Sequence, residues 1–352
     1  MKAIVIHDFV TSLDDVRVTD IPSPEAPQDG FLIRVHAAGV NFVDILYVRP
    51  SPVSEMPLIA QGKHQNNRSL VRPPFTLGLE FAGTIISAPP TSDFKPGDRV
   101  FGGYTGSYSE VISLPSSTTL HRIPSAWSIQ GAAGMAATLP VSYGALVQRA
   151  GLKAGQSVLV HAAAGGLGIM AVQVAAALGC RVIGTAGSAE KCAVAVKYGA
   201  AACIDYGKQR NWWKQVLELT DGKGVDVVFD PVGLIDLSLK CVAHYGKLLV
   251  VGFAGGDIEK IAMNRVLLKQ ASLIGYRYGE TLRRSPEEDR LLWHGLQPLI
   301  DAGRIEPVVY DTVYRGLESV PRALNDLNTR KVWGKAVITV DNEATTGLDA
   351  RL

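Results

Sequence analysis

The sequence contains few cysteines and almost no excess charge. Its 352 residues include four cysteines, none in a CxxC pair, at Cys180, Cys192, Cys203 and Cys241. This spacing argues against a disulfide framework and against a structural zinc site, and favours buried free thiols in a reducing compartment. Lysine and arginine total 35 against 33 acidic residues. So small a balance gives no electrostatic footprint for nucleic acid or an anionic membrane as a partner.

Segments typical of membrane or secreted proteins are also missing. No run of 18 uncharged apolar residues occurs, and the N-terminus reads as a strand rather than a signal peptide. We therefore expect a cytoplasmic protein with no membrane partner. The last three residues, Ala350-Arg351-Leu352, are a conservative variant of the Ser-Lys-Leu peroxisomal address, so a peroxisomal location is the alternative.

What the sequence does contain is apolar material and turn residues. Hydrophobic residues make up 47% and charged residues 19%, enough for a large core, and 36 glycines with 19 prolines imply many tight turns. The length suggests about two domains. Residues 1–125 read as short strands between turns, which predicts a mostly β domain. The predicted strands are Lys2–His7, Phe31–Ala38, Gly83–Ala88, Arg99–Gly102 and Tyr108–Ser113.

A different rhythm follows over residues 126–265. Strands alternate with helices of 10–13 residues, which is typical of a doubly wound parallel sheet. The predicted elements include strands 157–161, 181–185, 202–205, 225–230 and 247–251 and helices 166–178, 189–198 and 212–220. Residues 266–352 mix strands and amphipathic helices again, and we expect them to return to the first domain. The predicted fold class is therefore α/β, with a central parallel sheet and a second, mostly β domain.

The strongest motif is a strand that runs into a turn of small residues and then a helix. The turn has the sequence Ala164-Gly165-Gly166-Leu167-Gly168 and follows the apolar strand that begins near Val158. Small side chains let backbone N–H groups approach a pyrophosphate, and the positive end of the helix dipole faces its charge. In this context the turn predicts a dinucleotide site.

The end of the next strand indicates which dinucleotide binds. Enzymes that use NAD place a carboxylate there to hold the ribose 2′-hydroxyl. Here Gly187 and Ser188 follow the strand, and Lys191 lies one turn into the helix, where it can face a 2′-phosphate. The sequence therefore predicts NADPH as the cofactor.

Several further motifs resemble those of one family. They are residues 37–44 (AAGVNFVD), 78–83 (GLEFAG), 95–100 (KPGDRV), 161–168 (HAAAGGLG), 187–191 (GSAEK), 198–200 (YGA), 205–206 (DY), 229–233 (FDPVG) and 251–255 (VGFAG). From Met1 to about Val340 the chain resembles zinc-free medium-chain dehydrogenases/reductases of the quinone oxidoreductase, or zeta-crystallin-like, family. The resemblance implies a central Rossmann domain, a GroES-like catalytic domain built from both chain ends, and a homodimer joined through the Rossmann sheets.

The resemblance also implies roles for individual residues. Asn41 is expected near the nicotinamide ribose, with Asp44 shaping its loop and Tyr143 flanking the cofactor. Lys191 and Tyr206 are expected to hold the 2′-phosphate. The remaining cofactor residues implied are Gly252, Phe253, Ala254, Tyr276 and Arg277.

The same comparison bears on metal. Zinc alcohol dehydrogenases of this superfamily carry Gly-His-Glu where this chain has Gly78-Leu79-Glu80, and no cysteine precedes Cys180. We therefore expect no catalytic zinc, and Glu80 as a structural hydrogen-bond acceptor. Without a metal, the hydride acceptor must already be electrophilic, which points to a quinone or an α,β-unsaturated carbonyl.

One stretch departs from the family pattern. About a dozen residues, from about Tyr47 to about Leu58, separate Asp44 from the segment that normally follows it. This insertion either reshapes the substrate cleft or is an exposed flap. Tyr47 and His64 are candidate proton donors, with a surface position as the alternative for His64. Pro140 stands where a threonine is common, which puts one nicotinamide hydrogen bond in doubt.

Two other functions remain open. The first is a pathway-specific enone or enoyl reductase of secondary metabolism. The second is a non-catalytic NADPH-binding protein, like the crystallin and RNA-binding members of the family. The weak net charge and the lack of a basic, aromatic-laced patch argue against RNA.

Overall fold

The computed structural model describes residues 1–49 and 72–340, and within them the chain forms two compact units. The first unit comprises residues 1–49, 72–137 and 307–340, and the second comprises residues 138–306. This arrangement confirms the predicted combination of a parallel-sheet unit with a mostly β unit from both chain ends.

The second unit contains a six-stranded parallel sheet in the order β11-β10-β9-β12-β13-β14. Successive strands are added outward from β9 on one side of the sheet and outward from β12 on the other. The strand order therefore reverses between β9 and β12, as in dinucleotide-binding folds. The strands are β9 (Ser157–Val160), β10 (Arg181–Ala186), β11 (Ala202–Asp205), β12 (Val225–Asp230), β13 (Val242–Val250) and β14 (Ser272–Gly275). Val158, Leu159 and Val160 are fully buried because helices cover both faces of a parallel sheet.

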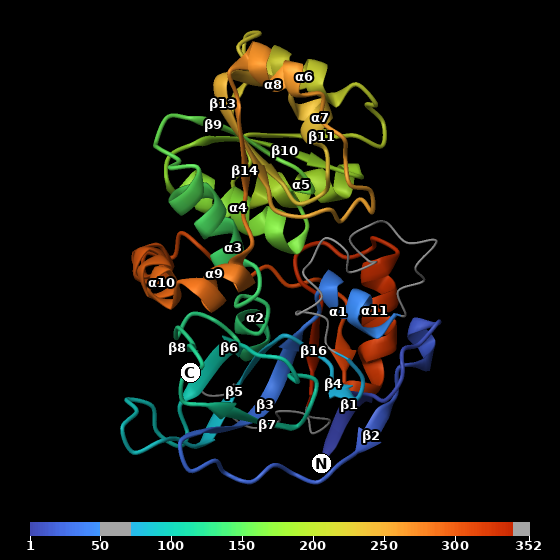
Figure 1. Cartoon of the computed structure of the whole chain (residues 1–352), viewed down its shortest axis with the longest axis vertical. Coiled ribbons are helices and arrows are strands. Elements are labelled where there is room, and N and C mark those ends of the chain that lie inside the picture. The colour runs from blue at the N-terminus through green and yellow to red at the C-terminus, as the bar shows by residue number, and fades with distance from the viewer. Residues whose placement is uncertain (50–71, 341–352) are drawn as a thin grey trace. The chain divides into compact units, whose positions relative to one another are not determined.

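Two helices, α4 (Gly166–Ala177) and α5 (Ala189–Lys197), cover one face of this sheet, and three cover the other (Figure 1). The three are α6 (Trp212–Leu219), α7 (Ile235–Ser238) and α8 (Met263–Lys269). The unit also contains α3 (Leu139–Tyr143), the π-helix η3 (Gly144–Arg149), α9 (Tyr278–Arg284) and α10 (Pro286–Asp301).

The first unit contains a three-stranded sheet, β2-β1-β4, and a larger sheet in the order β15-β16-β3-β5-β6-β8, with β7 also paired to β3. The strands are β1 (Lys2–Ile6), β2 (Val18–Asp20), β3 (Gly30–Gly39), β4 (Phe75–Thr76), β5 (Glu80–Ser87), β6 (Arg99–Gly103), β7 (Val111–Pro115), β8 (Leu120–Arg122), β15 (Tyr314–Arg315) and β16 (Val337–Thr339). The helices are η1 (Leu13–Asp15), α1 (Phe42–Val48), α2 (Ile129–Ala132), η4 (Leu317–Ser319) and α11 (Val320–Asn328).

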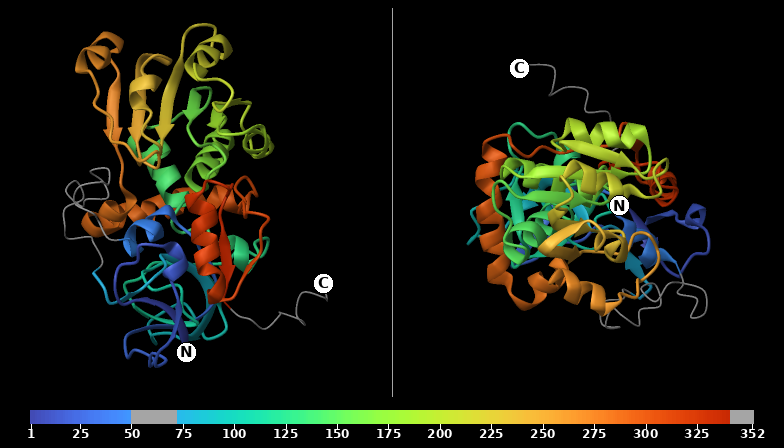
Figure 2. Two further views of the ribbon diagram at one scale, coloured as in Figure 1. Left: turned by 90° about the vertical axis from the view of Figure 1, so that its right-hand side faces the viewer. Right: turned by 90° about the horizontal axis from the view of Figure 1, so that it is seen from above.

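Antiparallel pairing of β16 with β3 joins the end of the chain to its beginning, and α11 packs beside α1 (Figure 2). A single apolar core lies beneath both segments. It includes Ile33 and Phe81 from the N-terminal part and Leu324 and Ile338 from the C-terminal part, all fully buried. The split domain that the resemblance implied is therefore present.

The boundaries lie later than the sequence predicted. The units change at residues 137/138 and 306/307, not at 125/126 and 265/266. Residues 126–137 pack through α2 on β3, β5 and β16 of the first unit. β14 pairs in parallel with β13, so it completes the Rossmann sheet and does not return to the first unit. The sequence did not indicate this, because the pairing of β14 with β13 is not visible in the local pattern of residues 272–275.

Some predicted features are small or lie elsewhere. Among the strands expected within residues 266–352, the stretch 308–315 forms only a bridge between Val309 and Lys335 and the short β15. No helix in residues 1–49 or 72–340 combines the length and apolarity needed to cross a membrane. The tripeptide Ala350-Arg351-Leu352 lies outside the described residues, so the peroxisomal alternative stays a prediction.

Candidate functional site

The phosphate turn, which we define as residues 162–168, follows β9 and leads into α4. The Gly165 N–H donates to the Ala162 carbonyl at 2.8 Å, and Gly165 is the N-cap of α4. A Cβ at Gly168 would lie 2.1 Å from the Ala162 oxygen and 2.7 Å from its carbonyl carbon. Backbone therefore packs on backbone, and only glycine fits at 168. The positive end of α4 begins where the strand order reverses, which is where such folds bind phosphates.

A buried histidine supports this turn from behind. His161 is fully buried, with Nδ1 2.9 Å from Thr185 Oγ1 and Nε2 2.8 Å from Ser238 Oγ. Ser238 Oγ donates to the Leu234 carbonyl, so it accepts the Nε2 proton, and Nδ1 accepts from Thr185. Burial lowers the pKa of His161, which keeps the ring neutral. The sequence analysis did not single out His161, although a polar residue ending an apolar strand was a usable signal.

The candidate 2′-phosphate residues gather at the ends of β10 and β11. Ser188 caps α5 by accepting the Lys191 N–H at 3.2 Å, which places Lys191 in the first turn. A Cβ at Gly187 would lie 3.1 Å from the Tyr206 hydroxyl, and Tyr206 is 38% exposed. The carboxylate of Asp205 accepts from the Gly207 N–H and so closes its own turn. The structure brings these predicted residues to one edge of the sheet.

The loop that carries Gly252, Phe253 and Ala254 leaves the same edge after β13. The Ala254 N–H donates to the Pro231 carbonyl at 2.9 Å. Asp230, buried at the end of β12, accepts from the N–H groups of residues 232, 233 and 234 at 2.8, 3.0 and 2.5 Å. The bonds to Asp230 hold the loop after β12, and the bond from Ala254 joins the loop after β13 to it.

Two predicted tyrosines are directed toward glycines of neighbouring helices in their own unit. A Cβ at Gly295 of α10 would lie 2.3 Å from the Tyr143 hydroxyl, and one at Gly144 would lie 2.0 Å from the Tyr276 hydroxyl. Burial raises the pKa of both phenols, that of Tyr276 to about 12. Arg277 is the N-cap residue of α9. The cofactor roles of these residues stay predictions.

In the first unit, Asn41 and Asp44 belong to the start of α1. The Asn41 N–H and the Tyr108 hydroxyl each donate to Asp44 Oδ2 at 2.8 Å. Asp44 is fully buried, and its Oδ1 has no hydrogen-bond partner among the described residues. Burial raises the pKa of Asp44 to about 7, although the bonds from Asn41 and Tyr108 and the charge of Lys335 oppose the shift.

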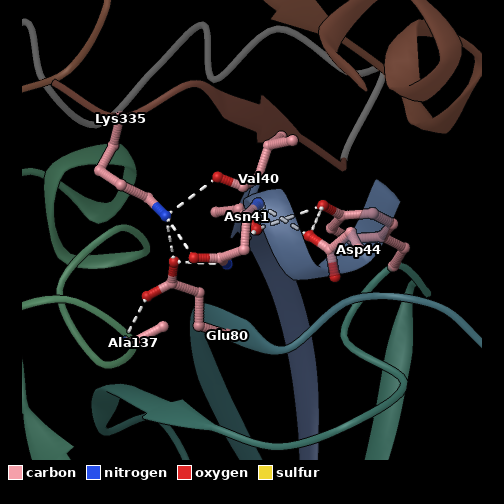
Figure 3. Close-up of polar contacts among 8 residues, drawn as sticks. Val40, Asn41, Asp44, Glu80, Ala137 and Lys335 are labelled. Carbon is pink, nitrogen blue, oxygen red and sulfur yellow. Dashed lines mark hydrogen bonds and ion pairs between the residues drawn. The ribbon is translucent and has the colours of Figure 1, made fainter. Parts of the chain in front are cut away.

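A buried ion pair lies next to this carboxyl. Lys335 Nζ is 2.7 Å from Glu80 Oε1, and the two side chains are 6% and 0% exposed. Glu80 Oε1 also accepts from Asn41 Nδ2 at 2.9 Å, and Glu80 Oε2 accepts from the Ala137 N–H at 2.8 Å (Figure 3). Glu80 is thus the structural acceptor that the sequence predicted. We call Asn41, Asp44, Glu80, Tyr108 and Lys335 the buried polar network.

Sequence reasoning missed Tyr108 and Lys335. A lysine just before β16 in an otherwise apolar segment was the only signal, and it did not identify a partner 255 residues away at Glu80. The candidate donor Tyr47 is half-buried. Its ring packs edge-on against that of Phe75, with 6.4 Å between the ring centroids. His64 and the insertion beyond Arg49 lie outside the described residues.

A zinc ion does not fit the polar network. Leu79 stands beside Glu80 where an imidazole would be needed, and the nearest groups are an amide and an ammonium. Across residues 1–49 and 72–340, no three His, Cys, Asp or Glu side chains form a group that could hold a metal.

Comparisons with known proteins identify the family. Residues 27–125 match the family model of the alcohol dehydrogenase GroES-like domain, and residues 166–293 match that of zinc-binding dehydrogenases. Quinone oxidoreductase-like protein 2 of Bos taurus is 36% identical over 330 residues, which cover 91% of this chain and 87% of the relative. The chain belongs to the quinone oxidoreductase family of medium-chain dehydrogenases/reductases.

Other members of this quinone oxidoreductase family agree. Human quinone oxidoreductase is 32% identical over 296 residues, covering 83% of each chain. The Escherichia coli quinone oxidoreductase complexed with NADPH superposes with a TM-score of 0.79 at 25% identity, over 96% of this chain and 100% of the other. Mycobacterial Rv1454c complexed with NADPH superposes with a TM-score of 0.81 at 28% identity, over 96% of this chain and 99% of the other. The predicted family and fold are confirmed, and the chain is an oxidoreductase.

Proposed function

We propose that this chain binds NADPH and transfers a hydride from it to a quinone or to an α,β-unsaturated carbonyl, without a metal. One observation carries the cofactor assignment: beside the phosphate turn, the ends of β10 and β11 offer Lys191 and Tyr206, with no carboxylate at positions 187 or 188. Two similar structures contain NADPH, which supports the same choice.

The chain's own residues have distinct tasks in this function. When bound, NADPH supplies the hydride. The N–H groups at the start of α4 bind the pyrophosphate, because the small residues of the phosphate turn leave the backbone accessible. Lys191 and Tyr206 bind the 2′-phosphate, and a strand end without a carboxylate does not repel it.

The acceptor must be electrophilic without the help of a Lewis acid. In quinones and enones the incoming negative charge delocalises onto oxygen, so weak donors and correct positioning suffice. Glu80 and Asp44 are buried and already bonded within the protein, so they position the Asn41 loop and do not transfer protons to substrate. Tyr47 and His64 stay the predicted proton donors.

Loss of NADPH absorbance at 340 nm with a panel of quinones and a panel of enones tests this function. Turnover of either panel supports it, and their relative kcat/KM values identify the acceptor class. Turnover of a single enone favours the pathway-specific reductase. Tight NADPH binding with no turnover of either panel would refute the enzymatic proposal and leave the cofactor-binding protein.

We also propose a homodimer formed through the Rossmann sheet. Among the described residues β14 pairs only with β13, so its other edge is open, and Met263, Leu267 and Leu268 of the preceding helix are 63% to 75% exposed. The double substitution Leu267→Glu/Leu268→Glu should yield monomers in sedimentation velocity. Leu291→Glu, at a 66% exposed leucine of α10, is the matched control and should remain dimeric. An unchanged mass for the double variant would exclude this interface.

A further inference from the structure

The ammonium of Lys335 is surrounded by three oxygens. Nζ lies 2.7 Å from Glu80 Oε1, 2.8 Å from Asn41 Oδ1 and 3.0 Å from the Val40 carbonyl oxygen. An ammonium carries three N–H donors and no acceptor, so the three bonds satisfy it completely. We call these three oxygens the oxygen cage.

Two glycines make room for the cage. A Cβ at Gly39 would lie 2.5 Å from Glu80 Oε1 and 2.7 Å from the Ala133 carbonyl oxygen. A Cβ at Gly134 would lie 3.0 Å from both Cβ and Cγ of Lys335. The first glycine leaves space for the carboxylate and the second for the aliphatic stem of the lysine, so the lysine and its partner are held from both sides.

The cage connects segments that are far apart in the sequence. Val40 and Asn41 join β3 to α1, Glu80 begins β5, and Lys335 directly precedes β16. Through its second oxygen, Glu80 also holds the backbone of Ala137. A single positive charge at this point therefore fixes four stretches of backbone, as a structural metal ion does in other proteins.

The family model that matches residues 166–293 is that of zinc-binding dehydrogenases, but the residues around Glu80 do not form a zinc site. Glu80 belongs to the Gly78-Leu79-Glu80 segment, where zinc alcohol dehydrogenases carry Gly-His-Glu, yet its neighbour is Leu79 and a lysine ammonium contacts its carboxylate. We propose that Lys335 is a built-in cation that takes the structural place of a metal ion in the oxygen cage. With a 6% exposed side chain and every donor engaged, Lys335 is a positioning residue and does not contact substrate.

Removal of the lysine should leave a cage that needs a replacement cation. In Lys335→Ala the missing atoms correspond to n-propylammonium. We expect Tm to fall by on the order of 5–10 °C, because the Glu80 charge is left unpaired. Added n-propylammonium chloride should raise Tm saturably. Tetramethylammonium chloride, which has the charge but no N–H donor, should not.

Wild type and the double variant Lys335→Ala/Glu80→Gln are the controls, and neither should respond to n-propylammonium. Equal responses to the two ammonium salts, or a response without Glu80, would overturn the proposal. If Lys335→Ala does not fold, Lys335→Met, Glu80→Gln and their double variant replace it in urea unfolding. The loss in the free energy of unfolding of the double variant must then be smaller than the sum of the losses in the two single variants. Additive losses would refute the cation role. Because the readout is stability, the result is independent of whether quinones or enones are reduced.

Discussion

The phosphate turn and the buried polar network are built from different parts of the chain. The phosphate turn is backbone packed on backbone, within seven consecutive residues, and contains no charged side chain. The network is made of side chains from residues as far apart as Asn41 and Lys335, and two of its members form a buried ion pair. We therefore expect substitutions in the phosphate turn to act through steric overlap, and substitutions in the buried polar network to act through unbalanced charge. The two kinds of effect can be measured separately.

Gly168→Val should have the largest effect. Its Cβ would lie 2.1 Å from the Ala162 carbonyl oxygen, and neither backbone can yield without opening the phosphate turn. Overpacking of this kind costs about 1–3 kcal/mol of stability. Since the pyrophosphate donors would move as well, we expect the Kd for NADPH to rise by on the order of 100-fold or more. Fluorescence titration with NADPH and a thermal melt measure both effects.

Gly279→Ala is the matched control in the same unit. A Cβ there meets nothing within 4 Å, and its φ is not in the left-handed region. Alanine favours a helix over glycine, so α9 should be unchanged or slightly more stable. If Gly168→Val binds NADPH as wild type does, the turn is not the pyrophosphate site.

The sequence predicts the phosphate turn well because its information is local. Strands 202–205 and 225–230 have the predicted bounds, and α4 ends one residue earlier than expected. Apolar runs, a terminal glycine and a helix cap all lie within a few residues of the feature they determine.

The buried polar network could be predicted only in part. The Gly78-Leu79-Glu80 motif indicated a structural acceptor at Glu80, but no local pattern indicates that Lys335 neutralises it. For the same reason the sequence did not predict that β14 belongs to the Rossmann sheet, since its pairing is decided by β13, which lies many residues away in the chain. Long-range partners and buried charge therefore needed the structure.

Lys191→Ala should have the next largest effect and should act on one cofactor only. It removes a charge-assisted contact commonly worth about 1.5–3 kcal/mol, which corresponds to about 10- to 150-fold in the affinity for NADPH. NADH lacks the 2′-phosphate, so its Kd should hardly change. Titration of both cofactors against wild type and Lys191→Ala measures the difference. Equal losses for NADH and NADPH would show that Lys191 supports the fold or the pyrophosphate instead.

In the network, Asp44→Asn should change how stability depends on pH. The pKa of Asp44 is raised from 3.8 to about 7 on folding, so the folded state binds more protons in this range. The contribution of the protonated Asp44 to the free energy of unfolding is complete below about pH 4 and is lost as the pH rises through 7. Wild type should therefore lose about 1–3 kcal/mol more than Asp44→Asn between pH 5 and pH 8.

Urea unfolding at the two pH values measures this difference. Asparagine is a good stand-in for the protonated acid, because its oxygen can accept from both the Asn41 N–H and the Tyr108 hydroxyl. Gly168→Val should keep the wild-type pH dependence, since the phosphate turn contains no group that titrates. Parallel pH curves for wild type and Asp44→Asn would contradict the assignment of a proton to Asp44.

Tyr206→Phe should give the smallest effect and would sharpen the comparison within the cofactor site. The hydroxyl lies close to Gly187, and its loss removes one hydrogen bond to the 2′-phosphate, worth about 0.5–1.5 kcal/mol or about 2- to 12-fold in NADPH affinity. The ring remains, so NADH binding and Tm should stay at wild-type values. Because Lys191 and Tyr206 would share one phosphate group, the losses in the double variant Lys191→Ala/Tyr206→Phe should not add. Strict additivity in titrations of the four proteins would mean that the tyrosine hydroxyl and the lysine contact different parts of the cofactor.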